Sequence, residues 1–224
     1  MSWYKAMLVI AGRLVNTKAL HQLNSVINYL EAGRWLKAGA YDVEHRVTGR
    51  PEIFELMAKK IAHRRVAYLE FGVYRGQLID YWSKRLTHPE SHLHGFDSFE
   101  GLPEDWNFHF RKDHFSLGGE APRFDDPRVR LFKGWFHETL PDYRLPDHDV
   151  LFVNIDADLY TSTKVVLDHL KDHLAVGTYL YFDEFCDRLQ EKRAFDEYTD
   201  ETHHRYRIVA ADPTLSNVLF QRVT

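Results

Sequence analysis

Carboxylates recur in this sequence at the places where apolar segments end. The residues concerned are Glu70, Asp97, Asp156, Asp183 and Glu184. The segment before Asp156, residues 150–155, is almost wholly apolar, which is typical of a central strand in a parallel sheet. Ligands of open α/β sheets bind beyond the carboxyl ends of the strands. The positions of these acidic residues therefore predict a binding site at that end of such a sheet.

Three of these carboxylates are expected to meet. Asp156 and the pair Asp183-Glu184 follow strands that we expect to be neighbours, about one strand spacing apart. Carboxylates this close repel one another unless they are protonated or neutralised. A divalent cation would neutralise them, and oxygen-only ligands favour a hard ion such as Mg²⁺. The alternative is a set of ion pairs with Lys164 or Arg193.

A glycine turn closes the first strand of the predicted core. Glu70, Gly72 and Gly76 lie where residues 66–71 end and a helix begins, and glycine lets a backbone approach a ligand closely. A helix N-terminus also favours an anionic group. Asp97 follows about twenty residues later, the spacing of a ribose-binding acid in nucleotide-binding sheets. These features favour a nucleoside ligand over a plain strand–turn–helix junction, without separating a nicotinamide cofactor from S-adenosylmethionine.

Two further segments could shape the site. Trp135 follows the third predicted strand and could either stack on an adenine ring or pack under the sheet edge. Residues 106–124 combine aromatic and charged side chains with the pair Gly118-Gly119. They could form a lid over an acceptor or a surface loop without a catalytic role.

The elements that must position these residues alternate between helix and strand from Pro51 onward. Apolar segments predict seven strands, at residues 66–71, 92–96, 129–132, 150–155, 178–182, 206–210 and 218–223. Intervening helical patterns predict parallel pairing, whereas the short connection between the last two strands demands an antiparallel pair. We expect an α/β domain over residues 51–224, with a mostly parallel seven-stranded sheet that ends in a C-terminal antiparallel hairpin.

Residues 1–50 differ from the rest of the chain in their pattern of apolar residues. Apolar side chains recur at helical spacing from Leu20 to Trp35, and glycines then interrupt the pattern. We expect one or two N-terminal helices. They could cap the core, make a homodimer contact or form one wall of the substrate site.

Composition narrows the class of protein. A chain of 224 residues is long enough for one domain with a core. The net charge of −4 does not favour a nucleic-acid or membrane partner, and the early apolar stretch is too short to span a bilayer. A single cysteine excludes an internal disulfide framework. We expect a cytoplasmic protein that acts on a small molecule.

Taken together, the strand-end motifs resemble those of the macrocin O-methyltransferase family, which modifies hydroxyls on antibiotic sugars. No single motif is specific, but the combination is, and it spans about residues 66–198, most of the core. The matching segments are residues 69–76 (LEFGVYRG), 95–103 (GFDSFEGLP), 133–136 (KGWF), 155–160 (IDADLY), 182–185 (FDEF) and 193–197 (RAFDE).

The resemblance implies a class I methyltransferase fold, a Rossmann-like three-layer sandwich, with S-adenosylmethionine as methyl donor and a Mg²⁺ ion. It implies that Asp156 is both general base and metal ligand, and that Asp183 and Glu184 complete the metal site. The residues implied to lie around the cofactor are Glu70, Gly72, Gly76, Asp97, Ser98, Trp135 and Asp156.

Two positions depart from the family pattern: Glu184 stands where a second aspartate is usual, and Tyr74 replaces the middle glycine of the turn. The expected reaction is Mg²⁺-dependent methyl transfer to a hydroxyl of a sugar or polyol-type small molecule. One alternative is a non-catalytic binding or assembly protein that has kept the fold. The other is a nicotinamide-dependent oxidoreductase, which the missing three-glycine fingerprint disfavours.

Overall fold

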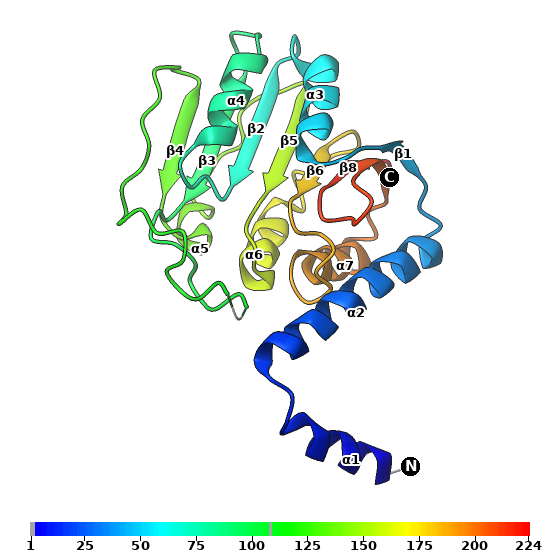
Figure 1. The fold of residues 1–224 in the computed structure, drawn as a ribbon. Coiled ribbons are helices and arrows are strands. Elements are labelled where there is room, and N and C mark those ends of the chain that lie inside the picture. Colours follow the sequence, from blue (N-terminus) through cyan, green and yellow to red (C-terminus); the bar gives the residue numbers. More distant parts are fainter. Residues whose placement is uncertain (1–2, 108) are drawn as a thin grey trace.

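The computed structural model describes residues 3–107 and 109–224 (Figure 1). Residues 1 and 2 of the N-terminal segment and residue 108 of the predicted lid lie outside the described residues. The helices are α1 (Trp3–Gly12), α2 (Thr17–Ala38), α3 (Arg50–Ile61), α4 (Gln77–Arg85), α5 (Phe136–Thr139), α6 (Tyr160–Leu170) and α7 (Glu191–Thr202). The strands are β1 (Val43–Arg46), β2 (Val66–Phe71), β3 (His92–Asp97), β4 (Val129–Lys133), β5 (Val150–Ile155), β6 (Tyr179–Phe182), β7 (Tyr206–Ala211) and β8 (Val218–Arg222).

The strands form one sheet in the order β1-β7-β8-β6-β5-β2-β3-β4. Neighbouring strands are parallel except where β8 pairs with β6 and β7, so the predicted C-terminal antiparallel hairpin is confirmed. The sheet has eight strands where the sequence predicted seven, because β1 adds to the edge beside β7. Only Val43 of β1 is buried, so this strand lacks the apolar alternation by which strands are recognised.

Helices cover both faces of the sheet, which confirms the predicted three-layer α/β fold (Figure 1). On one face α3 and α4 pack against side chains such as Tyr68 and Phe152. On the other face α6 and α7 pack against side chains such as Leu69 and Val153. Consecutive strand residues point to opposite faces, so β2 and β5 fill both cores in turn. That is why both strands are recognisable as continuous apolar runs.

The two N-terminal helices meet this core differently. The side chain of Asn16 caps α2 by accepting a hydrogen bond from the N–H of Ala19 at 2.8 Å, and α2 buries Asn28 and Ala32 against the domain. In contrast, α1 buries no residue and projects away from the domain (Figure 1). None of the helices in residues 3–107 and 109–224 is long and apolar enough to cross a bilayer.

Candidate active site

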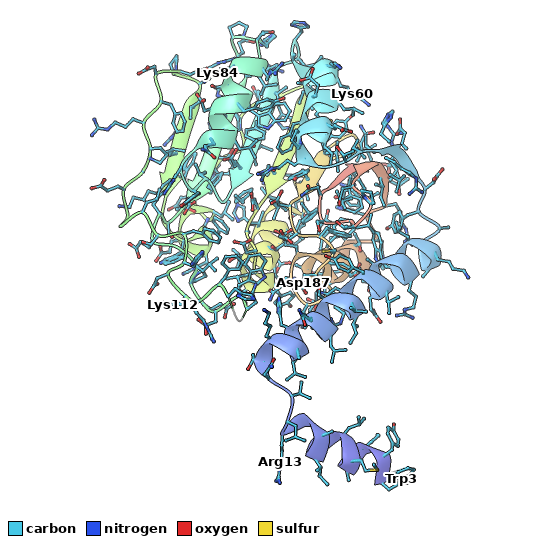
Figure 2. All side chains as sticks on the ribbon, in the orientation of Figure 1. Trp3, Arg13, Lys60, Lys84, Lys112 and Asp187 are labelled. Atoms are coloured by element: carbon cyan, nitrogen blue, oxygen red, sulfur yellow. The ribbon has the colours of Figure 1, made fainter. Side chains whose placement is uncertain are left out.

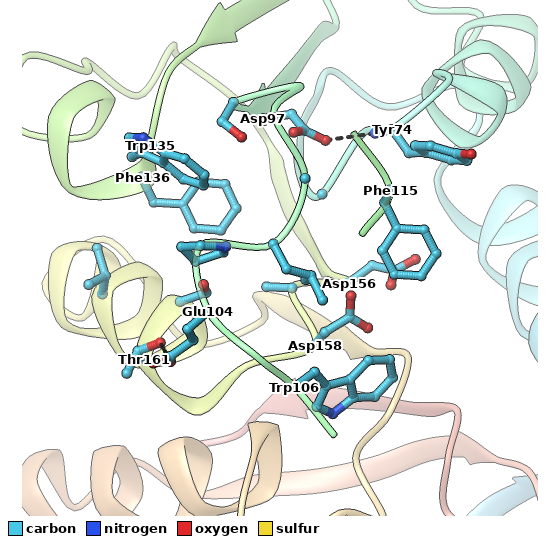
Figure 3. A pocket seen from close by; sticks show the side chains of 18 of the residues that line it. Tyr74, Asp97, Glu104, Trp106, Phe115, Trp135, Phe136, Asp156, Asp158 and Thr161 are labelled. Carbon is cyan, nitrogen blue, oxygen red and sulfur yellow. Dashed lines mark hydrogen bonds between the residues drawn. The ribbon is translucent and has the colours of Figure 1, made fainter. Parts of the chain in front are cut away.

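A cavity of about 790 Å³ opens at the carboxyl ends of the central strands (Figure 3). The turns and loops that follow β2, β3, β5 and β6 contribute to its walls. The structure thus brings together side chains that are far apart in the chain, as the parallel topology requires. The predicted site residues that line this cavity are Gly72, Asp97, Ser98, Trp135, Asp156, Asp183 and Glu184.

The glycine turn after β2 packs directly against the end of β5. Gly72 has a φ of +92°, and a Cβ placed on it would lie 1.9 Å from the backbone oxygen of Asp156, so a side chain does not fit there. The N–H of Asp156 in turn donates to the carbonyl of Phe71 at 2.9 Å. These contacts place the turn and Asp156 side by side in the cavity wall.

The side chain of Asp97 binds the backbone of the glycine turn. Its Oδ2 accepts hydrogen bonds from the N–H groups of Val73 and Tyr74 at 2.8 and 2.7 Å, and its Oδ1 accepts one from Phe99 at 2.7 Å (Figure 3). A carboxylate offers roughly four acceptor sites. About one acceptor site therefore remains for a ligand hydroxyl, and the other three bind the backbone of the turn and of Phe99.

Two residues predicted to contact a cofactor, Glu70 and Gly76, do not line the cavity. The side chain of Glu70 lies on the same face of β2 as Tyr68, whose hydroxyl donates to Glu70 Oε2 at 2.5 Å. Burial raises the pKa of Glu70 to about 8, and among the described residues its Oε1 has no hydrogen-bond partner. Gly76 caps α4 with a φ of +76°, and a Cβ there would clash with the ring of Phe124.

Aromatic rings wall the cavity on two sides. Trp135 and Phe136 lie together on one side, at the start of α5 (Figure 3). Tyr74 and Phe115 lie on the other, with ring centroids 5.7 Å apart. Of the two interpretations of Trp135, the structure thus supports a place in the cavity wall. Apolar faces of this kind suit a flat heterocycle or the face of a sugar ring.

The segment predicted as a lid, residues 106–124, lies against the cavity. Its backbone is tied down by hydrogen bonds from the N–H groups of Leu117 and Gly119 to the carbonyl of Phe99, at 3.0 and 2.8 Å. The described part of this segment thus has the position that a lid requires. Its residues in the cavity wall are Trp106, Phe110, Lys112 and Phe115.

Four carboxylates face the cavity from the loops after β5 and β6: Asp156, Asp158, Asp183 and Glu184. Burial, and then the charges of Asp183 and Asp158, raise the pKa of Asp156 well above its ordinary range. Burial and the charge of Asp183 also raise the pKa of Asp158 to about 7 and that of Glu184 to about 7. Asp158 was not predicted as a site residue, although it belongs to the same sequence motif as Asp156.

Arg50 supplies positive charge to this cluster. Its Nη1 lies 3.4 Å from Oδ2 of Asp156 and 3.2 Å from Oδ1 of Asp183. The partners considered from the sequence, Lys164 and Arg193, pair with other carboxylates instead. Arg50 is the first residue of α3 and lies 106 positions before Asp156, so no local pattern could have identified it.

Glu191 connects the two acidic loops from inside the protein. Its Oε1 accepts a hydrogen bond from the N–H of Ala157, and its Oε2 accepts one from the N–H of Glu184, both at 3.2 Å. It is fully buried, and that burial raises its pKa well above the ordinary range. Glu191 therefore sets the spacing between the loops. In the sequence it looks like any acidic residue that favours the first turn of a helix.

The cluster fits a hard divalent cation in the kind of ligand it offers. All four groups are carboxylates, which Mg²⁺ prefers. Their raised pKa values show that Arg50 does not fully neutralise them, so a further positive charge would stabilise the cluster. Within the part of the chain that the structure describes, no three His, Cys, Asp or Glu side chains converge as the ligands of one ion do. The chemistry of the donors thus fits the ion, while Arg50 bridges Asp156 and Asp183.

The chain is similar in sequence to known O-methyltransferases. The chain is 29% identical over 135 residues to 8-demethyl-8-(2,3-dimethoxy-alpha-L-rhamnosyl)-tetracenomycin-C 4'-O-methyltransferase of Streptomyces olivaceus, covering 52% of this chain and 48% of that protein. It is 31% identical over 119 residues to demethyldecarbamoylnovobiocin O-methyltransferase of Streptomyces niveus, covering 46% of this chain and 45% of that protein. The chain spans about half the length of the curated relatives it matches.

The fold has solved counterparts. The structure of the O-methyltransferase NovP superposes with a TM-score of 0.56 at 23% identity, over 77% of this chain and 76% of that one. This likeness supports the class I methyltransferase fold. The sequence profile of the macrocin-O-methyltransferase (TylF) family matches residues 48–216, which include the glycine turn, Asp97 and both acidic loops. The chain therefore belongs to the macrocin O-methyltransferase family.

Proposed function

We propose that this protein transfers a methyl group from S-adenosylmethionine to a hydroxyl of a sugar or polyol-type small molecule. One observation carries this proposal: a single cavity joins the glycine turn held by Asp97 to a cluster of carboxylates around Asp156. The first feature suits a nucleoside, and the second can accept a proton. The two curated relatives are named as O-methyltransferases, the first of a rhamnosyl-bearing tetracenomycin.

The turn side of the cavity suits the cofactor. The methionine part would lie against the backbone of Gly72, where a side chain is excluded and the ligand can approach closely. The ribose would use the remaining acceptor site of Asp97. The adenine would lie between Ser98 and Trp135, both of which line the cavity.

The acidic side suits the acceptor. Asp156 is adjacent to the turn, so a hydroxyl at Asp156 would face the methyl of the bound sulfonium. Asp156 would take the hydroxyl proton while the new O–CH₃ bond forms and the S–CH₃ bond breaks, leaving S-adenosylhomocysteine. Holding both reactants in one cavity supplies much of the rate enhancement.

We also propose that Asp156, Asp183 and Glu184 hold a Mg²⁺ ion. Such an ion, when bound, lowers the pKa of a hydroxyl that it coordinates. The carboxylate donors and their raised pKa values support the ion. Because Arg50 contacts two of the same carboxylates, we expect the affinity for the ion to depend on Arg50.

Binding and turnover measurements test this function. We expect calorimetry to show binding of S-adenosylmethionine and none of NAD. We expect methyl transfer to sugar-bearing metabolites when Mg²⁺ is present and its loss when a chelator is added. Absence of S-adenosylmethionine binding would favour a non-catalytic binding or assembly role. Transfer that persists with the chelator would contradict only the metal.

A further inference from the structure

Most of the exposed large hydrophobic side chains in the described part of the chain lie in the N-terminal segment. Among the described residues, nineteen large hydrophobic side chains are exposed, and all but Tyr74, Phe115, Val176, Leu189 and Val223 lie between Trp3 and Leu30. The fourteen in this segment present about 840–1,680 Å² of apolar surface, if each side chain contributes about 60–120 Å². The largest apolar patch on a monomer is usually only a few hundred Å².

The apolar face of α2 is turned away from the domain. Its outward stripe, defined as Leu20, Leu23, Val26, Ile27 and Leu30, has exposed fractions between 44% and 69%. Four members, Leu20, Leu23, Ile27 and Leu30, follow the 3-4-3 spacing of a coiled-coil seam. In a monomeric protein, a surface helix normally turns such a stripe toward the core of the domain.

The opposite face of α2 is held to the domain by polar contacts. Nη1 of Arg188 donates to Oδ1 of Asn24 at 2.8 Å and to Oδ1 of Asn28 at 2.5 Å. Nε1 of Trp35 donates to Oδ1 of Asp196 at 2.8 Å. The outward stripe could turn inward only if these bonds broke, so its exposure follows from how α2 is anchored.

The preceding helix, α1, needs cover as well. Met7, Leu8, Val9 and Ile10 are four consecutive apolar residues, so they surround the helix, and each is at least 58% exposed. Figure 2 shows α1 standing clear of the domain, with its side chains extending into open space. A helix that is apolar all round is stable when it is buried among other elements.

We propose that the outward stripe of α2, together with α1, forms the contact between two copies of this chain. A twofold contact uses the same patch on both copies and therefore requires a self-complementary surface. The heptad-spaced stripe meets this requirement, and the available area is similar to the roughly 800 Å² per partner of a standard interface. Two copies of α1 and α2 together make a four-helix arrangement.

Charge favours a second copy over a lipid surface as the partner of α2. No Lys, Arg, Asp or Glu occurs in residues 19–30, so two stripes meet without like-charge repulsion. Helices that lie on anionic membranes carry Lys and Arg on their polar face. The polar face of α2 in this stretch has neither, and it is turned toward the domain.

The mass of the full chain in solution tests this contact. We expect light scattering to give twice the chain mass of 26.5 kDa for the wild type, and half that value for Leu23→Glu/Ile27→Glu. Val176→Glu is the control, because it places a glutamate on an exposed apolar site elsewhere and should leave the mass doubled. A single-chain mass for the wild type, an unchanged doubled mass for the double variant, or loss of the dimer in the control would overturn the contact.

Cross-linking provides a measurement that does not depend on a disruptive variant. Ile27→Cys should be joined to a second chain by a short bis-maleimide, whereas Val176→Cys and the wild type, whose only cysteine is buried, should not. Failure of Ile27→Cys to cross-link would contradict the contact. A wild type that stays monomeric but sediments with vesicles of phosphatidylcholine and phosphatidylglycerol would instead identify a membrane surface as the partner.

Discussion

The two sides of the cavity use their carboxylates in opposite ways. At the glycine turn, the single carboxylate of Asp97 accepts three backbone hydrogen bonds. Around Asp156, four carboxylates face the cavity, and Arg50 pairs with two of them, Asp156 and Asp183. Burial beside other carboxylates disfavours the charged form of a carboxylate. Accordingly, the pKa values of Asp156, Asp158 and Glu184 are raised.

This contrast gives the two sides of the site different roles: Asp97 maintains the shape of the turn, whereas Asp156 is the proposed reacting group. The acceptor sites of Asp97 are mostly occupied, so its removal should change the shape of the turn. Burial and neighbouring carboxylates disfavour the ionised form of Asp156, so its carboxylate has an increased affinity for a proton or a cation. Two substitutions, one at each side, should therefore affect different steps of the proposed reaction.

The largest effect is expected for Asp156→Asn. An amide cannot take the acceptor proton, so we expect methyl transfer to fall by about 10²–10⁴-fold, the usual contribution of a general base. Affinity for S-adenosylmethionine should change little, because the turn does not depend on the Asp156 side chain. Single-turnover assays and calorimetry measure the two quantities. Asp168→Asn, at an exposed carboxylate of α6, is the control, and wild-type turnover in Asp156→Asn would remove Asp156 from the proposed mechanism.

A smaller effect is expected for Asp97→Ala, and on binding rather than on turnover. Three backbone N–H groups lose their acceptor, at a cost of about 1–3 kcal/mol for each one that stays unsatisfied. We expect the affinity for S-adenosylmethionine to fall by about 10–100-fold, since each 1.4 kcal/mol is a factor of ten. Asp126→Ala removes a similar turn acceptor, which binds the N–H of Arg128 away from the cavity, and should leave the affinity intact. Equal losses in both variants would mean that Asp97 has no special role at the turn.

The smallest effect on the reaction is expected for Glu70→Gln, which should instead change the pH dependence of stability. The pKa of Glu70 is raised from 4.5 to about 8 in the folded protein. Between these values the folded chain keeps a proton that the unfolded chain releases, so stability falls as pH rises, by up to about 1.4 kcal/mol per pH unit. Glutamine removes this slope, so the variant should gain stability relative to the wild type from pH 5 to pH 8. Urea unfolding at several pH values measures it, with the exposed Glu201→Gln as control. Parallel pH curves for wild type and Glu70→Gln would show that Glu70 is ionised in the fold.

Local patterns were sufficient for most of the fold. The apolar runs of β2 and β5 have the predicted bounds, because both strands are buried on both faces and are therefore mostly apolar, with Glu70 and Asn154 as their polar residues. The short connection to β8 correctly required antiparallel pairing. The acidic residues after β3, β5 and β6 gather at one cavity, since parallel strands end on the same side of a sheet.

Other features were not recognisable in the sequence. The sequence did not reveal β1, which has a single buried residue. It also did not show that Glu70 lies on the Tyr68 face of β2 and outside the cavity wall, because a strand that is buried on both sides has no polar face that distinguishes the two. Arg50 and Glu191 reach the acidic loops from other elements, and such contacts depend on packing between distant segments.

By itself, the sequence determined the class of fold, the family and the strand-end positions of the acidic residues, because these depend on periodicity and on short motifs. Only the tertiary structure decided what each acidic residue does there. Asp97 binds the backbone of the turn, and Glu70 lies on the face of β2 that carries Tyr68. Arg50 and Glu191 contact the acidic loops around Asp156. The tertiary structure also turned the apolar stripe of α2 outward. The physical reason is that a side chain's protonation and its partners depend on burial and on neighbours within a few ångströms, which distant parts of the chain supply.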